Sequence, residues 1–463
     1  MERLSPLDSS FLHIEDDVSH MHIASVAIFE GPPPAFDVVV GMFRGKLPLV
    51  PRYRQVVKFV PFDLGRPVWV DDPHFNIDYH IRHTALPAPG GEAELRKLVG
   101  RVMAQQLDRA KPLWEVWVVQ GLEDGHWAMM SKSHHCMVDG VSGTDLLALT
   151  LDTSPQGTDP VPDDWRPEAP PSSATLAAGA LAERVRSPYE FVRSMRSATR
   201  IPRQTIAAAG DVVKGLRAMT GLVRPTPESS LNGPIGPHRR WAWASTTVDD
   251  IKRVRKGTGA SFNDVVLAAA TRGFRDLLLS RGESVDRAVR TLVPVSVRPR
   301  DASGKAVGDG TFENRVSAMF AELPVSIADP LERLGAIASQ MAGLKDSKQA
   351  VAGEALTSLS GFAPPMLLAL GTRIATRTQQ RNINTVTTNV PGPQVPLYAA
   401  GRRMLKAYPY VPLGGSIRFG VAIFSYNGQV NFGVTGDYDT TADIDVLCRG
   451  IENGMTELLE VSG

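Results

Sequence analysis

The chain has 463 residues, too many for one ordinary hydrophobic core, so we expect two domains. Its 50 Lys and Arg residues nearly balance 49 Asp and Glu, and the formal charge of +1 gives no overall positive field that would attract nucleic acid. A hydrophobic fraction of 43% with 21% charged residues is typical of a globular protein and excludes a largely disordered one.

Cysteine usage and hydropathy indicate the compartment. The two cysteines, Cys136 and Cys448, are too few for a disulfide framework, which favours a reducing environment. Residues 1–6 lack the basic-then-apolar order of a signal peptide. No uncharged apolar run reaches the roughly 18 residues that a membrane-spanning helix needs. We therefore expect a cytoplasmic protein that meets a membrane only from its surface.

The first third of the chain mixes short strands and helices. Residues 23–29 predict a buried strand, which the glycine and prolines of residues 31–34 end. Residues 115–119 and 126–133 predict two neighbouring strands, joined by a turn at residues 123–125. Between the strand of residues 23–29 and this pair lies an amphipathic helix, whose apolar residues recur at helical spacing. They are Leu95, Leu98, Val99, Val102 and Met103.

The most informative stretch follows the second of these strands. It reads His134-His135-Cys136-Met137-Val138-Asp139-Gly140, and residues 141–149 then predict the first turns of a helix. A junction of strand, loop and helix is where α/β proteins usually present functional groups, and histidine exchanges protons near neutral pH. Because successive strand side chains point to opposite faces, only one of the two histidines can project into a given cavity. The other is then a packed or hydrogen-bonded support.

The middle of the chain differs in composition. Residues 154–173 are crowded with proline and aspartate and predict a linker. Residues 176–224 are alanine-rich and compatible with helix, with an excess of Lys and Arg over Asp and Glu. Two interpretations stay open for this basic segment. It forms either solvated surface helices or a reversible contact with anionic lipid headgroups.

A second α/β segment begins near Trp241. Ser261 and Asp264 predict an approximate capping box at the start of a helix with one apolar face. Four strands are expected after it, the last two joined by the hairpin signal Asn427-Gly428. Their residues are 292–297, 385–389, 420–426 and 430–435, and residues 389–393 predict a rigid turn. We thus divide the chain into an N-terminal half, a linker with the basic segment, and a C-terminal half. Their boundaries are 1–155, 156–235 and 236–463.

The pattern His-His-x-x-x-Asp-Gly of residues 134–140 resembles the signature of the CoA-dependent acyltransferase superfamily. That superfamily includes chloramphenicol acetyltransferase and the condensation domains of nonribosomal peptide synthesis. Further segments, in the same order along nearly the whole chain, resemble the bacterial wax ester synthase/diacylglycerol acyltransferase (WS/DGAT) family in particular. They are residues 4–8, 21–24, 112–115, 262–265, 314–317 and 389–393.

This resemblance implies a two-domain α/β protein of the chloramphenicol acetyltransferase-like fold, with mixed sheets flanked by helices and an active-site channel between the halves. It implies an O-acyltransferase that moves a long-chain acyl group from acyl-CoA to the hydroxyl of diacylglycerol, forming triacylglycerol, or of a fatty alcohol, forming a wax ester. No metal or redox cofactor is expected. The expected location is cytoplasmic, peripheral at the inner membrane face or at a lipid droplet.

The resemblance also assigns roles to single residues. His135 is the general base, because a neutral imidazole can take the proton of an alcohol as it attacks a thioester, and His134 supports it. Asp139 is expected to pair with Arg298 and hold the loop, and not to pair with His135. Gly140 leaves room at the start of the following helix. Asn263 either donates to an oxyanion or serves a local turn, and both interpretations stay open.

Other readings of these residues are weaker. A metal site is disfavoured because adjacent strand residues diverge and no second ligand pair stands at metal spacing. Cys136 is not needed as a nucleophile, since acyl-CoA is already an activated thioester. Two alternatives are kept. One is a condensation-type enzyme with a carrier-bound donor, and the other is a lipid-binding protein of the same fold with weak or no catalysis.

Overall fold

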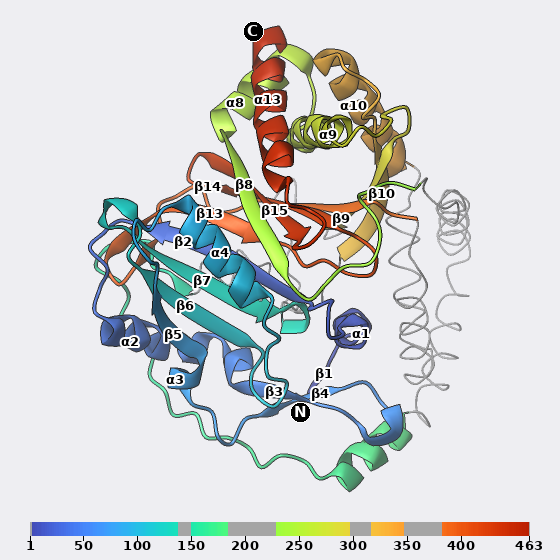
Figure 1. Cartoon of the computed structure of the whole chain (residues 1–463). Helices are drawn as coiled ribbons and strands as arrows, with labels where there is room; N and C mark the ends of the chain where they lie inside the picture. The colour runs from blue at the N-terminus through green and yellow to red at the C-terminus, as the bar shows by residue number, and fades with distance from the viewer. Residues whose placement is uncertain (1, 138–149, 184–227, 297–315, 347–381, 463) are drawn as a thin grey trace, which may run out of the picture.

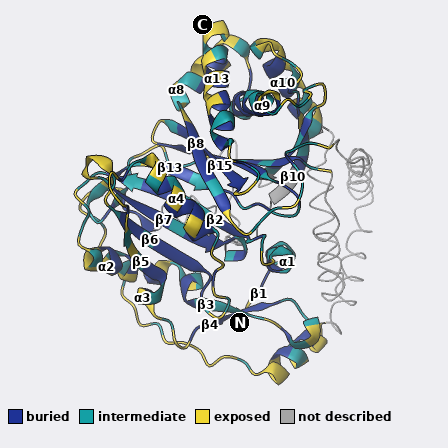
Figure 2. Ribbon diagram, viewed as in Figure 1, coloured by how far each residue is buried: buried dark blue, intermediate teal, exposed yellow. Residues whose placement is uncertain are grey.

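The computed structural model describes residues 2–137, 150–183, 228–296, 316–346 and 382–462. Two six-stranded mixed sheets organise these residues, one in the lower and one in the upper body of the molecule (Figure 1). Buried residues concentrate on the strands and on the helix faces that cover them (Figure 2). The predicted α/β class with mixed sheets and flanking helices is confirmed.

The lower sheet has the strand order β12-β13-β2-β7-β6-β5. Its strands are β2 (His22–Phe29), β5 (Ile81–Ala85), β6 (Trp114–Gln120), β7 (Trp127–His134), β12 (Tyr398–Ala399) and β13 (Arg402–Tyr410). Only β5 and β6 run parallel, and β6 and β7 form the neighbouring pair expected from the sequence. Residues 123–125 make the turn between β6 and β7 as a single 3-10 turn.

Helix α4 (Glu92–Met103) is the amphipathic helix that the apolar spacing predicts. Its apolar face is buried in one cluster with Met130 of β7 and with Trp241 and Trp243 of the upper sheet. The helix therefore packs between the two bodies, as Figure 1 shows. Two further helices of the lower body are α2 (Phe36–Lys46) and α3 (Ile77–His80). A small sheet at the N-terminus joins β1 (Glu2–Arg3), β3 (Gln55–Lys58) and β4 (Val68–Asp71).

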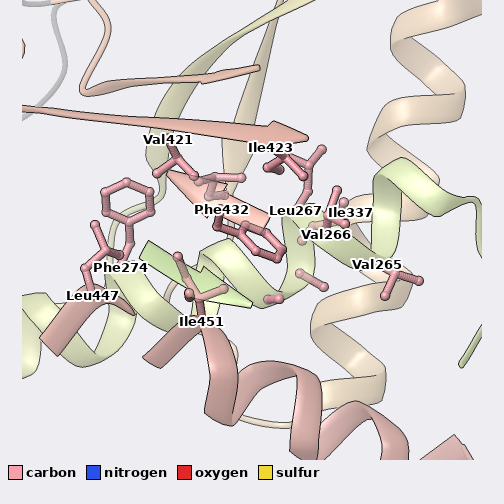
Figure 3. Packing of buried hydrophobic residues seen from close by; sticks show 14 of the residues in the cluster. Val265, Val266, Leu267, Phe274, Ile337, Val421, Ile423, Phe432, Leu447 and Ile451 are labelled. Carbon is pink, nitrogen blue, oxygen red and sulfur yellow. The ribbon is translucent and has the colours of Figure 1, made fainter. Parts of the chain in front are cut away.

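The upper sheet has the order β10-β9-β11-β14-β15-β8. Its strands are β8 (Arg239–Thr247), β9 (Val289–Ser296), β10 (Val316–Leu323), β11 (Thr385–Val390), β14 (Phe419–Tyr426) and β15 (Gln429–Asp437). The helices packed with it are α8 (Val248–Thr258), α9 (Phe262–Ser280), α10 (Pro330–Asp346) and α13 (Ile444–Ser462). The largest apolar core lies between these helices and the sheet, where Phe274, Phe432 and Ile451 meet (Figure 3).

Two local signals behave as expected. The hairpin of β14 and β15 turns at Asn427 and Gly428, whose φ angles are 44° and 86°, the left-handed pair that a two-residue hairpin requires. β11 ends at Val390, and Gly392 follows in a tight approach to the neighbouring strand. A Cβ atom on Gly392 would lie 2.1 Å from the carbonyl oxygen of Ser425, so only glycine fits there.

One feature crosses the predicted halves. β12 and β13 belong to residues 236–463 of the sequence, yet β13 pairs antiparallel with β2 in the lower sheet. The C-terminal half therefore completes the N-terminal sheet by contributing β12 and β13 to it. The boundaries 1–155, 156–235 and 236–463 remain a prediction, and the C-terminal part contributes strands to both sheets.

Several expectations fall partly or wholly outside the described residues. Residues 157–172 form no helix or strand, and residues 173–183 are helical. The helix expected at residues 141–149 and most of the basic segment, residues 184–224, lie outside the described part of the chain. Among the described residues, no helix combines the length and the apolar character that crossing a bilayer requires.

Candidate active site

The two histidines stand where β7 ends. His134 is the last residue of the strand, and His135 begins the 3-10 turn η5 (His135–Met137). The N–H of His135 donates to the carbonyl oxygen of Met21 at 2.8 Å, and that of His134 donates to Leu113 at 2.9 Å. The turn is thus tied on one side to the start of β2 and on the other to the segment before β6.

The imidazole of His135 lies against an aromatic ring. The Phe11 ring stacks on it with a centroid distance of 4.0 Å and an interplanar angle of 25°. Burial lowers the pKa of His135 from 6.5 to about 4, although its own backbone carbonyl acts in the opposite direction. Its Nδ1 atom is buried and hydrogen-bonds to no other residue within the described ranges. His135 is therefore neutral at pH 7, the state in which an imidazole can accept a proton.

His134 makes different contacts and is fully buried. Its Nδ1 atom accepts a hydrogen bond from the backbone N–H of Cys136 at 3.1 Å. Its Nε2 atom lies 2.9 Å from Oε2 of Glu15, at ion-pair distance but without the geometry of a hydrogen bond. A nitrogen that accepts an N–H carries no proton, so the proton of this imidazole sits on Nε2. These contacts support the interpretation of His134 as a hydrogen-bonded support.

Glu15 was not singled out by the sequence, although it is at the centre of this network. Its carboxylate is 1% exposed. Oε1 accepts from Gln106 at 2.7 Å and from Arg109 at 3.1 Å, and Oε2 accepts from the N–H of Met21 at 3.1 Å. Burial raises the pKa of Glu15, but its contact with His134 and its other hydrogen-bond donors outweigh the effect of burial. The pKa of Glu15 therefore lies well below its usual range, and the group is an anion.

Helix α1 (Pro6–Ile14) carries Phe11, and Glu15 is the C-cap residue that follows it. Ser5 caps it by accepting the N–H of Asp8 at 3.1 Å, so the segment 4–8 that carried a family resemblance is a helix start. The backbone N–H of Glu15 donates to the carbonyl oxygen of Phe11 at 3.1 Å, so the two residues follow each other one turn apart at the end of the helix. That spacing was visible in the sequence, but nothing local indicated that the helix would pack against η5.

Asn263 lies in the first turn of α9, where Ser261 and Asp264 form the predicted capping box. The two capping hydrogen bonds measure 3.3 Å and 2.8 Å. The side-chain amide of Asn389, at the end of β11, donates to Oδ1 of Asn263 at 3.4 Å. Two segments that resembled the family, 262–265 and 389–393, are thus brought together. Neither the oxyanion role nor the turn role of Asn263 is decided by this contact.

The remaining predicted site residues are Asp139, Gly140 and Arg298, and all three lie outside the described residues. Their pairing and their roles therefore stay predictions. β9 is described as far as Ser296, two residues before Arg298.

Cys136 is buried, and burial raises the pKa of its thiol well above the ordinary value. The thiolate that a nucleophilic cysteine needs is therefore disfavoured. Over the ranges that the structure describes, no group of three or more His, Cys, Asp and Glu side chains is arranged to hold a metal ion.

Comparison with known proteins identifies the family. The family profile described as wax ester synthase/diacylglycerol acyltransferase catalytic domain matches residues 4–266, and the profile of the WS/DGAT C-terminal domain matches residues 312–459. The probable diacylglycerol O-acyltransferase tgs1 of Mycobacterium tuberculosis H37Rv is 38% identical over 465 residues, covering 100% of this chain and 96% of that protein. A putative diacylglycerol O-acyltransferase of Mycobacterium bovis has the same identity and coverage.

Solved structures lead to the same family. The wax ester synthase/diacylglycerol acyltransferase from Marinobacter aquaeolei VT8 matches with a TM-score of 0.66, 25% identity and 100% coverage of both chains. The starter condensation domain of rhizomide synthetase, solved with C8-CoA, matches with a TM-score of 0.60 and covers 99% of this chain and 94% of its own, but at 16% identity it shares the fold alone. The chain therefore belongs to the wax ester synthase/diacylglycerol acyltransferase family and has its chloramphenicol acetyltransferase-like fold.

Proposed function

We propose that this protein is an acyl-CoA-dependent O-acyltransferase that esterifies diacylglycerol with a long-chain acyl group and so forms triacylglycerol. Fatty alcohols are a second class of acceptor, which would give wax esters. The observation that carries the proposal is the neutral imidazole of His135, placed at a strand end within the His-His-x-x-x-Asp-Gly pattern. Its relatives named diacylglycerol O-acyltransferase, and its match to the WS/DGAT structure along the whole chain, support the choice of substrates.

His135 acts as the general base in this reaction. Since Nδ1 is buried beside its own carbonyl group, Nε2 is the nitrogen that takes the proton of the acceptor hydroxyl. The oxygen then attacks the thioester carbonyl and forms a tetrahedral intermediate. Collapse of that intermediate breaks the carbon–sulfur bond, and the departing CoA thiolate receives the proton back from His135. The activated acyl group comes with its CoA, so no metal or redox cofactor takes part.

The other residues prepare this chemistry. His134 holds the turn through its bond from Cys136, and the Asp139–Arg298 pair holds the rest of the loop. Gly140 leaves room for the acyl or CoA path. Asn263, at the N-terminal end of α9, is a candidate donor to the oxyanion of the intermediate. The family resemblance implies a channel between the two halves, through which the two substrates would enter.

The two alternatives are less well supported. The condensation domains share the fold at 16% identity or less, whereas the WS/DGAT profiles cover most of the chain. A lipid-binding protein without catalysis would have no need for a neutral histidine that is stacked on Phe11 of α1 and hydrogen-bonded to Met21 before β2. Turnover of free acyl-CoA with an alcohol, and none with an amine acceptor, distinguishes the proposal from both.

The test is product analysis after incubation with palmitoyl-CoA and a panel of diacylglycerol, hexadecanol and short alcohols. His135→Ala should remain folded and lose on the order of a hundredfold or more in rate. His134→Ala should lose less, or lose activity mainly through lower stability. Near-normal turnover by a folded His135→Ala protein would remove the mechanism.

Contact with a lipid surface is a separate part of the proposal, because these acceptors partition into bilayers and droplets. The loop between β3 and β4 presents Phe59 and Phe62, which are 38% and 87% exposed, next to Lys58. Aromatic and basic side chains together suit the interface of an anionic membrane. We place the protein in the cytoplasm, peripheral at the inner membrane face or at a droplet, with the basic residues 184–224 adding to the contact.

Co-sedimentation with anionic vesicles tests the contact. Binding should fall as salt rises, because exposed charges are screened, and it should fall with Phe62→Ser and with substitution of Arg193, Arg196 and Arg200. Leu279→Ser, at a 48% exposed leucine on α9, is the matched control and should bind normally. If neither salt nor any of these substitutions lowers binding, the membrane contact lies elsewhere on the protein.

A further inference from the structure

We propose that Glu15 is a positioning residue for this reaction. Its carboxylate keeps the proton of His134 on Nε2, so that Nδ1 stays free to hold the backbone N–H of Cys136 and with it the turn that presents His135. The catalytic consequence rests on the proposed function. The position of the proton on His134 does not depend on the proposed function, and it can be measured without substrate.

The surroundings of Glu15 favour an acceptor at this position. Every described hydrogen bond of the carboxylate comes from a donor: Gln106 and Arg109 donate to Oε1, and the Met21 N–H donates to Oε2. Nε2 of His134 lies 2.9 Å from the same Oε2 atom. A side chain without oxygen at this depth would leave these donors facing an apolar surface. The carboxylate is therefore matched to its site by its acceptor capacity as well as by its charge.

The consequence for His134 follows from its two nitrogens. With the proton on Nε2, Nδ1 presents a lone pair to the Cys136 N–H at 3.1 Å. If the proton moved to Nδ1, two donors would face each other, and a buried backbone N–H would lose its partner. The residue between His134 and Cys136 is His135. A change of tautomer at His134 would therefore move the backbone of His135, the general base.

Glu15 reaches the same backbone by a second route. Its Oε2 atom accepts the N–H of Met21, while the carbonyl oxygen of Met21 accepts the N–H of His135. One buried carboxylate therefore links α1, the start of β2 and the end of β7. Because the geometry of a general base controls proton transfer, a small shift of this turn lowers turnover more than it lowers substrate affinity.

Two variants separate the loss of the acceptor oxygens of Glu15 from a change in the length of its side chain. Glu15→Met keeps the length of the side chain and removes both oxygens. Glu15→Gln keeps one oxygen for His134, because Gln106 can turn its own amide and Arg109, whose side chain is 36% exposed, can turn to solvent. Asp152→Asn is the matched control: this buried carboxylate accepts from Lys46 at 2.7 Å and has no described contact with either histidine.

Three measurements are made on each full-length variant: kcat and KM with palmitoyl-CoA, thermal unfolding, and the tautomer of His134 from ¹⁵N ring shifts of histidine-labelled protein. Wild type should show His134 with the proton on Nε2. Glu15→Met should shift the proton toward Nδ1 and lower kcat about 10–100-fold, as loss of a histidine's hydrogen-bond partner does elsewhere, with KM little changed. Glu15→Gln should keep the tautomer and most of kcat. Asp152→Asn should lose stability without a change at His134.

The proposal is overturned if wild-type His134 carries its proton on Nδ1, a result that needs no variant to fold. It is also overturned if kcat falls in Glu15→Met while His134 keeps its Nε2 proton, because the role would then be structural only. A changed tautomer with unchanged kcat counts against it equally. Absence of acyl transfer in the wild type would instead refute the proposed function and leave the His134 measurement standing.

Discussion

Phe11 offers a direct test of why His135 is neutral. Its ring stacks on the imidazole at 4.0 Å, and burial holds the pKa of His135 at about 4. In Phe11→Ala, water reaches the imidazole, and the charged form is no longer penalised by burial alone. We therefore expect the pKa of His135 to rise toward its ordinary value of about 6.5.

The size of the effect depends on pH. At pH 6 a base with a pKa of about 4 is about 99% neutral, while one with a pKa of about 6.5 is only about 24% neutral. Full exposure would thus lower kcat/KM about fourfold at pH 6 relative to pH 8, in addition to any loss that is the same at every pH. The wild type should show almost no change between these two pH values.

The assay is kcat/KM with palmitoyl-CoA between pH 5 and pH 8, which reports the pKa of the free enzyme's base. Phe11→Leu, which keeps an apolar cover, should move the acidic limb less. Phe59→Ala removes a nearby aromatic ring that contacts His13 and should leave the limb unchanged. An acidic limb at the wild-type position in a folded Phe11→Ala protein would refute the reasoning, since the stack would then not control the pKa.

Two further predictions concern stability. Burial lowers the pKa of His80 to about 4 and that of His22 well below 6.5, as it does for His135. The unfolded chain therefore binds more protons than the folded protein below pH 6.5. The free energy of unfolding is then highest above pH 6.5 and falls as the pH drops from 6.5 to 4, by about 3 kcal/mol for His80 alone. Equal urea unfolding midpoints at pH 7 and pH 5 would contradict this prediction. For the predicted pair of Asp139 with Arg298, substitution of either residue should lower the free energy of unfolding by about 3–5 kcal/mol or disorder the loop. Unfolding curves and activity assays should both show the loss. An Asp139 carboxylate bonded to His135 in an experimental structure would show that the pairing is wrong.

Local chemistry was sufficient for many elements. The capping box of Ser261 and Asp264 starts α9 where the sequence predicts, and the apolar spacing of residues 95–103 produces a helix buried on that face. The turn at Asn427 and Gly428 needs two residues that accept positive φ, and such residues are recognisable without any tertiary information. These predictions succeed because neighbours in the chain supply the hydrogen bonds and the steric limits involved.

The sequence by itself determined the family, through motifs spread over nearly all of the chain, and it identified His135 through its motif and the end of a predicted strand. Only the tertiary structure decided what surrounds that histidine. Phe11 stacks on His135 and Glu15 contacts the neighbouring His134, each from about 120 residues away, and β13 joins β2 across the predicted halves. Hydrophobic packing is non-directional and does not depend on sequence distance, so the partner of an apolar helix face cannot be read from its spacing. The aromatic stack of Phe11 on His135 and the contact of Glu15 with His134 therefore became visible only once α1 was packed against η5.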